Sequence, residues 1–295
     1  MKIFSQFSRL ALGAHHVVDG DAEVGGPRPH QRHPRQHHLR TLVIAQHHSL
    51  ALVVGIGEGE MLLHLIDDAL DYSGREAKLG KSVGLVGQSQ GGGAAFATAG
   101  EAVTYAPDLD IRGTVATGTP YFTNDTAPVV RDPNAVSGVF AYSLYIMYLA
   151  EQADPTFKIA DYITEKAKPV IETTRTQCLM AAWNQIEKEG LNQTNTFTKD
   201  PTPALVKYYP LMAYSTLKVK GPVFLGTGGK DKDVPPPGQK RLFNDACAAG
   251  SVIEHKLYPD LDHSGTVNGS LADSTPFVKK AFAGEPILGN CKTPT

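Results

Sequence analysis

Cysteine is scarce in this sequence, and its scarcity excludes two classes of protein. The 295 residues contain only Cys178, Cys247 and Cys291. Three cysteines are too few for a small disulfide scaffold, and none stands at the paired spacing of a metal site. The count permits one disulfide with one cysteine left over, but it does not choose the pair.

Long apolar runs and an excess of one charge are also missing. No segment reaches the roughly 18 apolar residues that a membrane-spanning helix needs. Lys and Arg number 28 against 30 Asp and Glu, which gives a net charge of −2. Proteins that bind nucleic acid usually carry a basic surplus. We therefore expect neither an integral membrane segment nor a nucleic-acid partner.

The first fifty residues contain little apolar material that a core could use. Eight of the eleven histidines lie between His15 and His48, mixed with Pro, Gly and Arg in GGPRPHQRHPRQHHLR. This composition predicts an irregular segment over residues 1–50. Paired histidines can ligate zinc or copper, but no acidic or cysteine partner stands at regular spacing, so we expect no metal site. A replaced native N-terminus, from a frame error or a cloning junction, is an equally open explanation.

From Leu50 onward, strand-like and helix-like segments alternate. Alternation of this kind predicts a mostly parallel sheet flanked by helices on both faces, here built from residues 51–120 and 216–295. The expected strands are 50–55, 81–87, 111–120, 221–229 and 251–259, and the expected helices are 59–74, 90–100 and 238–250. A last helix is expected to begin with Thr275 as N-cap and Pro276 as its first residue, and to stop at Gly284.

Between residues 121 and 215 the alternation stops. AVSGVFAYSLYIMYLAEQ and the following 157–190 stretch predict helical hairpins instead of strands. The segment is too long for a plain connection, so we expect a helical insertion.

Residues 87–91, GQSQG, fit the G-x-S-x-G pattern of a nucleophile elbow. A serine on a tight strand-to-helix turn takes a strained backbone conformation, and its neighbours two before and two after must be small. The following helix directs its positive N-terminus toward the serine oxygen. The pentapeptide alone is a weak signal, but here it follows the strand-like SVGLV and precedes a small-residue helix. We therefore expect Ser89 to be a nucleophile, the alternative being a structural serine in a tight turn.

A serine nucleophile needs a histidine base and a carboxylate that orients it, which in this architecture follow in the order Ser, Asp/Glu, His. The loop after the 221–229 strand carries Asp231 and Asp233, and the loop after the 251–259 strand carries His263. Both loops lie at carboxyl ends of predicted parallel strands, where such sheets gather their active-site groups. His255 falls inside a strand and is expected to pack or face solvent, and the acids beside His263 (Asp260 and Asp262) to cap loops.

A family resemblance is carried by the segments VGLVGQSQGG, GTGGKDKDVPPPGQ and YPDLDHSG. The sequence resembles the secretory lipases, a family of α/β-hydrolases, and the resemblance covers about residues 53–291. In the family's G-x-x-D-x-x-V-P pattern the acid stands four residues before the proline, which implies Asp231 and not Asp233 as the acid. The resemblance also implies a Cys247–Cys291 disulfide, with Cys178 left over. It further implies that residues 121–215 form a helical cap over the site.

The same resemblance implies serine ester hydrolysis, and one part of the machinery is hard to find. The backbone N–H of Gln90 would supply one oxyanion donor, but no upstream loop for the second donor is recognisable. Losing one donor costs on the order of 10²–10³ in turnover. The aromatic residues Phe140, Tyr142, Tyr145 and Tyr148 would either line an acyl pocket or pack within the cap, and packing is the commoner role.

The sequence therefore predicts an esterase or lipase in which Ser89 attacks, His263 transfers the proton, Asp231 orients His263 and Gln90 N–H stabilises the oxyanion. No cofactor or metal is required, and the expected partner is a small-molecule or lipid ester, with lipid-interface contact through the cap. The alternatives are a peptidase or other acyl-transfer hydrolase, or a catalytically weak protein with an incomplete oxyanion hole. The resemblance suggests a secreted or periplasmic protein, although MKIFSQFSRLALGA is a poor signal peptide because Gln6 and Arg9 interrupt its apolar centre.

Overall fold

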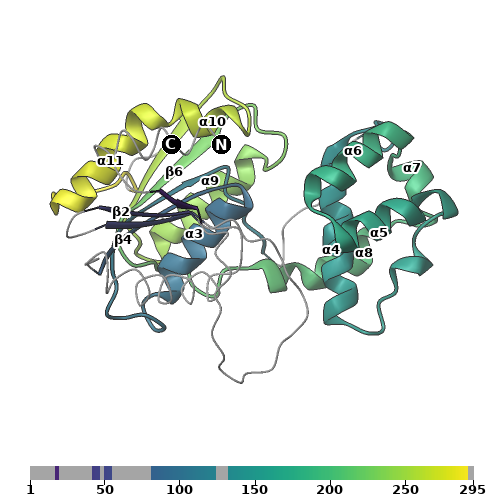
Figure 1. The fold of residues 1–295 in the computed structure, drawn as a ribbon, viewed down its shortest axis with the longest axis horizontal. Helices are drawn as coiled ribbons and strands as arrows, with labels where there is room; N and C mark the ends of the chain where they lie inside the picture. The colour runs from purple at the N-terminus through teal and green to yellow at the C-terminus, as the bar shows by residue number, and fades with distance from the viewer. Residues whose placement is uncertain (1–16, 20–41, 47–49, 55–80, 124–131, 292–295) are drawn as a thin grey trace. The chain divides into compact units, whose positions relative to one another are not determined.

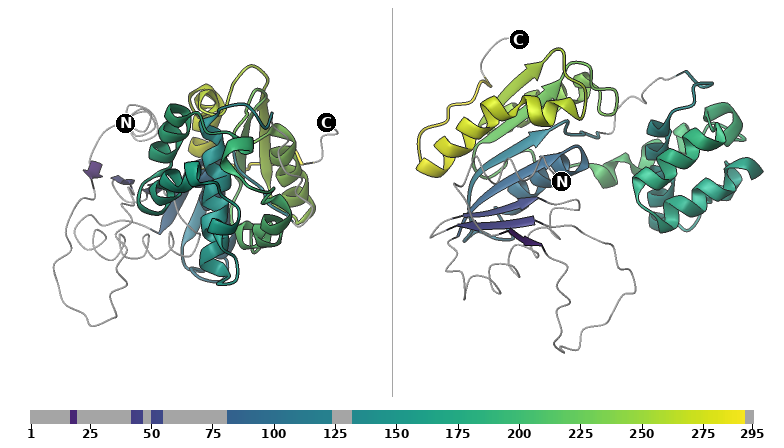
Figure 2. Two further views of the ribbon diagram at one scale, coloured as in Figure 1. Left: turned by 90° about the vertical axis from the view of Figure 1, so that its right-hand side faces the viewer. Right: turned by 45° about the horizontal axis from the view of Figure 1, so that its top comes forward.

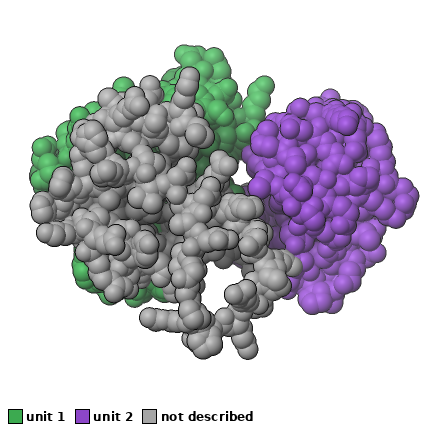
Figure 3. Space-filling view, viewed as in Figure 1, with its two compact units in different colours: residues 1–121, 214–295 green, residues 122–213 purple. Residues whose placement is uncertain are grey.

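In the computed structural model of the chain, the described residues are 17–19, 42–46, 50–54, 81–123 and 132–291 (Figure 1). The chain divides into two compact units, one made of Met1–Tyr121 with Tyr214–Thr295 and the other of Phe122–Ala213 (Figure 3). The expected helix 59–74 lies outside the described residues, as does most of the histidine-rich stretch. Among the described residues, no helix is both long and apolar enough to cross a membrane.

The first unit is built on a seven-stranded sheet whose strands lie side by side in chain order (Figure 2). Strands β1 to β3 pair antiparallel, and β3 to β7 run parallel to one another. The strands are β1 (Val17–Asp19), β2 (Leu42–Gln46), β3 (Leu50–Val54), β4 (Ser82–Gln88), β5 (Asp110–Thr117), β6 (Val223–Gly228) and β7 (Ile253–Tyr258). The mostly parallel α/β sheet predicted from the sequence is thus confirmed, with two strands drawn from residues 1–50.

Helices cover both faces of this sheet because successive strand residues point to opposite sides. On one face, alternate strand residues such as Leu85 and Leu225 pack with Phe96 of α3 (Gln90–Glu101) and Leu242 of α9 (Pro236–Ala248). On the other face the strand residues Val86, Val115 and Phe224 pack against Phe277 of α11 (Leu271–Ala283). A short helix, α10 (Gly265–Gly269), precedes α11. Near-continuous apolar runs in β4 to β6 follow from burial on both sides.

The predicted start of the last helix is wrong, and its predicted end is correct. Helix α11 begins at Leu271, so Thr275 is not its N-cap and Pro276 lies inside it. The earlier start places Ser274 and Phe277 in the buried face of the helix, with Ser274 N–H bonded to Ser270 O at 2.8 Å. Packing against the sheet therefore outweighs the local preference of proline for a first turn. Gly284 ends the helix in the left-handed conformation, with φ of 70°.

The second unit, Phe122–Ala213, is built mainly from helices in its described residues, with one isolated antiparallel bridge between Ile163 and Phe197. Its α-helices are α4 (Ala141–Ala153), α5 (Lys168–Thr176), α6 (Leu179–Glu189), α7 (Gln193–Thr196) and α8 (Thr202–Leu205), and its 3₁₀ turns are η1 (Gly138–Phe140), η2 (Ile159–Asp161), η3 (Glu165–Ala167) and η4 (Val206–Met212). It has a core of its own, in which Leu144, Met147 and Ile186 are fully buried. Gly190 ends α6 in the left-handed conformation.

The aromatic residues of α4 and the turn before it pack within this helical unit. The ring of Phe140 meets that of Phe197 edge to face at 5.2 Å between centroids, and the Tyr145 hydroxyl donates to the Gln177 carbonyl at 2.9 Å. Phe140, Tyr145 and Tyr148 lie against the unit's buried core. These contacts favour the packing role over the acyl-pocket role.

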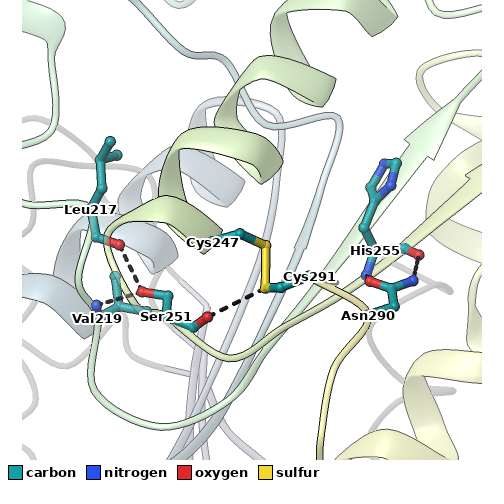
Figure 4. Close-up of a disulfide and its surroundings, with 7 residues drawn as sticks. All are labelled: Leu217, Val219, Cys247, Ser251, His255, Asn290 and Cys291. Atoms are coloured by element: carbon teal, nitrogen blue, oxygen red, sulfur yellow. Dashed lines mark hydrogen bonds between the residues drawn. A yellow bond between two sulfur atoms is a disulfide. The ribbon is translucent and has the colours of Figure 1, made fainter. Parts of the chain in front are cut away.

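The Cys247–Cys291 disulfide is present and ties the C-terminal segment to α9 (Figure 4). Cys178 is free and exposed. The two Cα atoms are 5.4 Å apart, within the usual range. Beside Cys291, the Asn290 side chain accepts the backbone N–H of His255 at 2.8 Å and donates to its carbonyl at 2.7 Å. The C-terminal segment is therefore fastened to α9 by the disulfide and to the edge strand β7 by this amide pair.

We expect the Cys291→Ser substitution, made together with Cys247→Ser, to lower the free energy of unfolding by about 3–4 kcal/mol, since the bridge closes a loop of 44 residues. Urea denaturation measures the loss, with Cys178→Ser as the matched control because that thiol is exposed and unpaired. Intact mass should rise by the mass of two hydrogen atoms on reduction of the native protein. Three free thiols in the native protein would contradict the pairing.

Candidate active site

Ser89 stands at the turn between β4 and α3 in a strained backbone conformation. Its φ is 58° and its ψ is −124°, and it is the one non-glycine residue with positive φ in the described part of the chain. The Ser89 N–H donates to the Thr117 carbonyl at the end of β5, at 2.8 Å, which holds the turn against the neighbouring strand. Strain of this kind persists only where the surrounding structure enforces it, and it clusters at functional sites.

The steric requirement behind G-x-S-x-G is visible at Gly87. A Cβ atom on Gly87 would lie 1.8 Å from the carbonyl oxygen of Gly91, so no side chain fits there. Gly92 is less restricted but still close, because its Cβ would lie 2.9 Å from Thr119 Oγ1 and 3.0 Å from the Thr117 carbonyl oxygen. The glycine-rich run thus allows the first turn of α3 to approach β4 and β5 closely.

Gln90 is the first residue of α3 and is exposed. The first N–H groups of a helix have no intrahelical partner, and they carry the positive end of the helix dipole. No acidic side chain lies in the first turn of α3 to neutralise that end. The Gln90 N–H therefore lies at the positive end of α3, directly after Ser89.

Asp231 is buried in the loop after β6, with only 4% of its surface exposed, and is fixed by four hydrogen bonds. Oδ1 accepts the backbone N–H groups of Asp233 at 3.0 Å and Val234 at 2.8 Å. Oδ2 accepts Nε2 of Gln239 at 3.0 Å and lies 2.8 Å from Nδ1 of His263. Of the two acids in this loop, Asp231 is the one that contacts His263.

His263 lies in the loop after β7, mostly buried at 8% exposure. Because the carboxylate of Asp231 accepts a hydrogen bond, the proton is placed on Nδ1 and Nε2 is left free as a base. Burial lowers the pKa of His263, but the hydrogen bond and charge of Asp231, with the charges of Asp233 and Asp262, raise it more. The net pKa lies above the ordinary histidine value.

Ser89, Asp231 and His263 follow β4, β6 and β7, whose parallel course brings their carboxyl ends to one edge of the sheet. Gln88 Nε2 lies 3.5 Å from the His263 carbonyl oxygen, a long contact that joins the serine turn to the histidine loop. Within the described residues the Ser89 hydroxyl makes no hydrogen bond to His263. Such bonds often tighten only when substrate binds.

The remaining acids and histidine of these loops have other roles. His255 stacks on Phe243, and its Nε2 lies 3.1 Å from Thr227 Oγ1. Burial, with the charge of Lys240, lowers the pKa of His255 to about 4. Asp262 accepts the N–H of Gly265 at 2.7 Å and so caps its loop, as expected. Asp260 pairs with Lys230 at 3.0 Å.

Two residues of this site were not expected from the sequence. Gln239 of α9 is buried and donates to both Asp231 Oδ2 and the Val234 carbonyl. Gly118, the residue after β5, lies against the His263 ring. The sequence indicates Gln239 only as a polar residue on an otherwise apolar face of its helix. It indicates Gly118 only by its position at the end of a strand.

In the described part of the chain, no three His, Cys, Asp or Glu side chains lie close enough together to bind a metal ion. The paired histidines between residues 15 and 48 lie outside the described residues, as does any upstream loop carrying a second oxyanion donor.

Residues 52–290 match the model of a protein family described as secretory lipase. The chain is 26% identical over 258 residues to "Lipase A" of Moesziomyces aphidis, which covers 83% of this chain and 54% of the relative. It is 23% identical over 247 residues to "Secreted triacylglycerol lipase LIP5" of Malassezia furfur, covering 80% of this chain and 64% of that protein. The chain thus spans between about half and two thirds of the length of these relatives.

Among solved structures, the chain resembles lipase A of Candida antarctica with a TM-score of 0.63 and 23% identity, over 80% of this chain and 56% of that one. This likeness shows the α/β-hydrolase fold. The family-model match over residues 52–290 includes β4 to β7 and therefore all three loops that carry Ser89, Asp231 and His263.

Proposed function

Because the chain belongs to the secretory lipase family, we propose that it is a serine hydrolase that cleaves carboxylic esters through Ser89, His263 and Asp231. The observation that carries the proposal is the buried Asp231–His263 pair, 2.8 Å apart, at the same sheet edge as the strained Ser89 turn. A structural serine has no need of a neighbouring histidine whose tautomer is fixed by a carboxylate.

In the proposed reaction, Nε2 of His263 accepts the proton of the Ser89 hydroxyl as Oγ attacks the ester carbonyl. Asp231 holds the imidazole through Nδ1 and stabilises the imidazolium that forms. The imidazolium then gives its proton to the departing alcohol, which leaves an acyl-enzyme. In the second half, His263 activates a water molecule that releases the acid and restores Ser89.

The negative oxygen of the tetrahedral intermediate is proposed to lie at the N-terminus of α3, where the Gln90 N–H donates to it. Donors fixed before reaction act here without reorganisation. A second donor would come from residues outside those described. Its contribution decides between a fully active enzyme and the weak hydrolase that the sequence also permits.

The proposed substrate class is a lipid ester, since a matched relative is named as a triacylglycerol lipase. The family and the secreted relative suggest an extracellular protein, and a disulfide is typical of such surroundings. The helical unit Phe122–Ala213 is the segment that the sequence predicts to act as a cap, and this role stays a prediction.

A panel of p-nitrophenyl esters from butyrate to palmitate, with aminoacyl p-nitroanilides beside them, tests the reaction class. We expect a burst of p-nitrophenol followed by steady ester turnover, and at least ~100-fold slower release from the anilides, because an amine leaves less readily than a phenolate. Preference for long acyl chains would mark a lipase and preference for butyrate an esterase. Faster cleavage of the anilides would identify a peptidase and overturn the proposal.

A further inference from the structure

Gly118 follows β5 and lies between the serine turn and the histidine loop. It is in the left-handed region, with φ of +57°, and its N–H donates to the Gly226 carbonyl on β6 at 3.0 Å. A Cβ atom on Gly118 would lie 2.9 Å from both Cε1 and Nδ1 of His263 and 3.4 Å from Asp231 Oδ2. The preceding residue, Thr117, accepts the Ser89 N–H.

The contact falls on the edge of the imidazole that bonds to Asp231. Because a carbon atom at 2.9 Å is closer than real side-chain carbons approach, an added methyl group would displace either the ring or the β5 end. The β5 end is held on one side by the Gly118–Gly226 bond and on the other by the Thr117–Ser89 bond. The ring of His263 is attached through a loop, so the ring is the part that moves.

We propose that Gly118 is a positioning residue, whose missing side chain creates the space in which His263 lies against Asp231. Its effect on the reaction rests on the proposed function, whereas the contact with the imidazole does not. The left-handed backbone conformation of Gly118 also favours glycine at this position, because L residues with a side chain rarely adopt it.

Gly118→Ala is the direct variant, and Gly250→Ala is its matched control. Gly250 also has positive φ, at +89°, but a Cβ atom there would meet no atom within 4 Å. Both variants therefore carry backbone strain, and only Gly118→Ala adds the contact with His263. We expect Gly118→Ala to lower kcat about 100-fold with KM nearly unchanged, since a displacement of ~1 Å can cost that much. Gly250→Ala should stay within a few-fold of the unmodified protein.

The pKa of His263 gives a readout that does not depend on turnover. The charged groups that raise this pKa are Asp231, Asp233 and Asp262. Displacement from Asp231 should lower it, measured by NMR titration of the ring with His263→Ala to identify its signal. Gly250→Ala should leave it unchanged. An unshifted pKa in folded Gly118→Ala protein would overturn the positioning role.

A double-mutant cycle keeps the proposal testable should Gly118→Ala fold poorly. In a His263→Ala background the imidazole is gone, so the methyl group of the Gly118→Ala change fits the vacated space. We expect its effect on the urea midpoint to fall to that of Gly250→Ala in the double variant. Equal destabilisation in both backgrounds would show that the contact has no consequence. If the two changes are coupled in this way but the protein hydrolyses no ester, the proposed function is overturned and the positioning of His263 by Gly118 is not.

Discussion

Ser89→Ala is expected to abolish ester hydrolysis, with kcat falling by a factor on the order of 10⁴–10⁶. Alanine removes the oxygen that attacks the carbonyl and retains the strand-turn-helix geometry around it. His263 and Asp231 alone cannot form an acyl-enzyme, so the burst of p-nitrophenol should vanish together with steady turnover.

Ser264→Ala is the matched control for that loss. Ser264 follows His263, is exposed, and makes no capping hydrogen bond with α10. Its replacement removes a hydroxyl from the same region without touching the proposed reaction, so activity should remain within a few-fold. Turnover of Ser89→Ala comparable with that of the control would show that another residue attacks the ester.

Asp231→Asn should reduce kcat by a factor of about 10⁴. An asparagine of the same shape offers an amide instead of a carboxylate, which turns His263 to the wrong tautomer and leaves the imidazolium without a countercharge. Asp233→Asn is the control, since this acid lies in the same loop but Asp231 makes the bond to His263. If Asp233→Asn were the more damaging of the two, the assignment of the acid would be wrong.

The pH profile gives an independent reading of the same pair. His263 must be neutral to act as a base, and its pKa is raised, so kcat/KM of the unmodified protein should fall on acidification with a midpoint above 6.5. Asp231→Asn removes the hydrogen bond and charge that raise this pKa, and should move the midpoint to lower pH. Asp233→Asn should move it much less, because only its charge acts on the ring.

The serine turn could be predicted from the sequence because its constraints are local. Gly87 and Gly91 stand two residues on either side of Ser89, and the clash that requires a glycine at position 87 involves only the backbone of Gly91 and Gly92. Likewise, loops that follow neighbouring parallel strands must share an edge, so the order Ser, Asp, His sufficed to bring Asp231 and His263 together.

Gly118 and Gln239 could not be predicted, because their importance comes from contacts with residues more than a hundred positions away or on another element. Nothing near Gly118 in the chain indicates that an imidazole lies over it. The start of α11 was misplaced for a related reason. Local proline chemistry favoured Pro276 as a first-turn residue, and burial of Ser274 and Phe277 against the sheet extended the helix past it.

Labelling with a fluorophosphonate tests most directly whether Ser89 is an activated nucleophile, because the reagent reacts with a serine only when a nearby base activates it. We predict one adduct per chain on the tryptic peptide that contains Ser89, abolished by Ser89→Ala and retained in Ser264→Ala. Folded protein that takes up no label, or that carries the adduct on another serine, would contradict the assignment of Ser89 as the nucleophile.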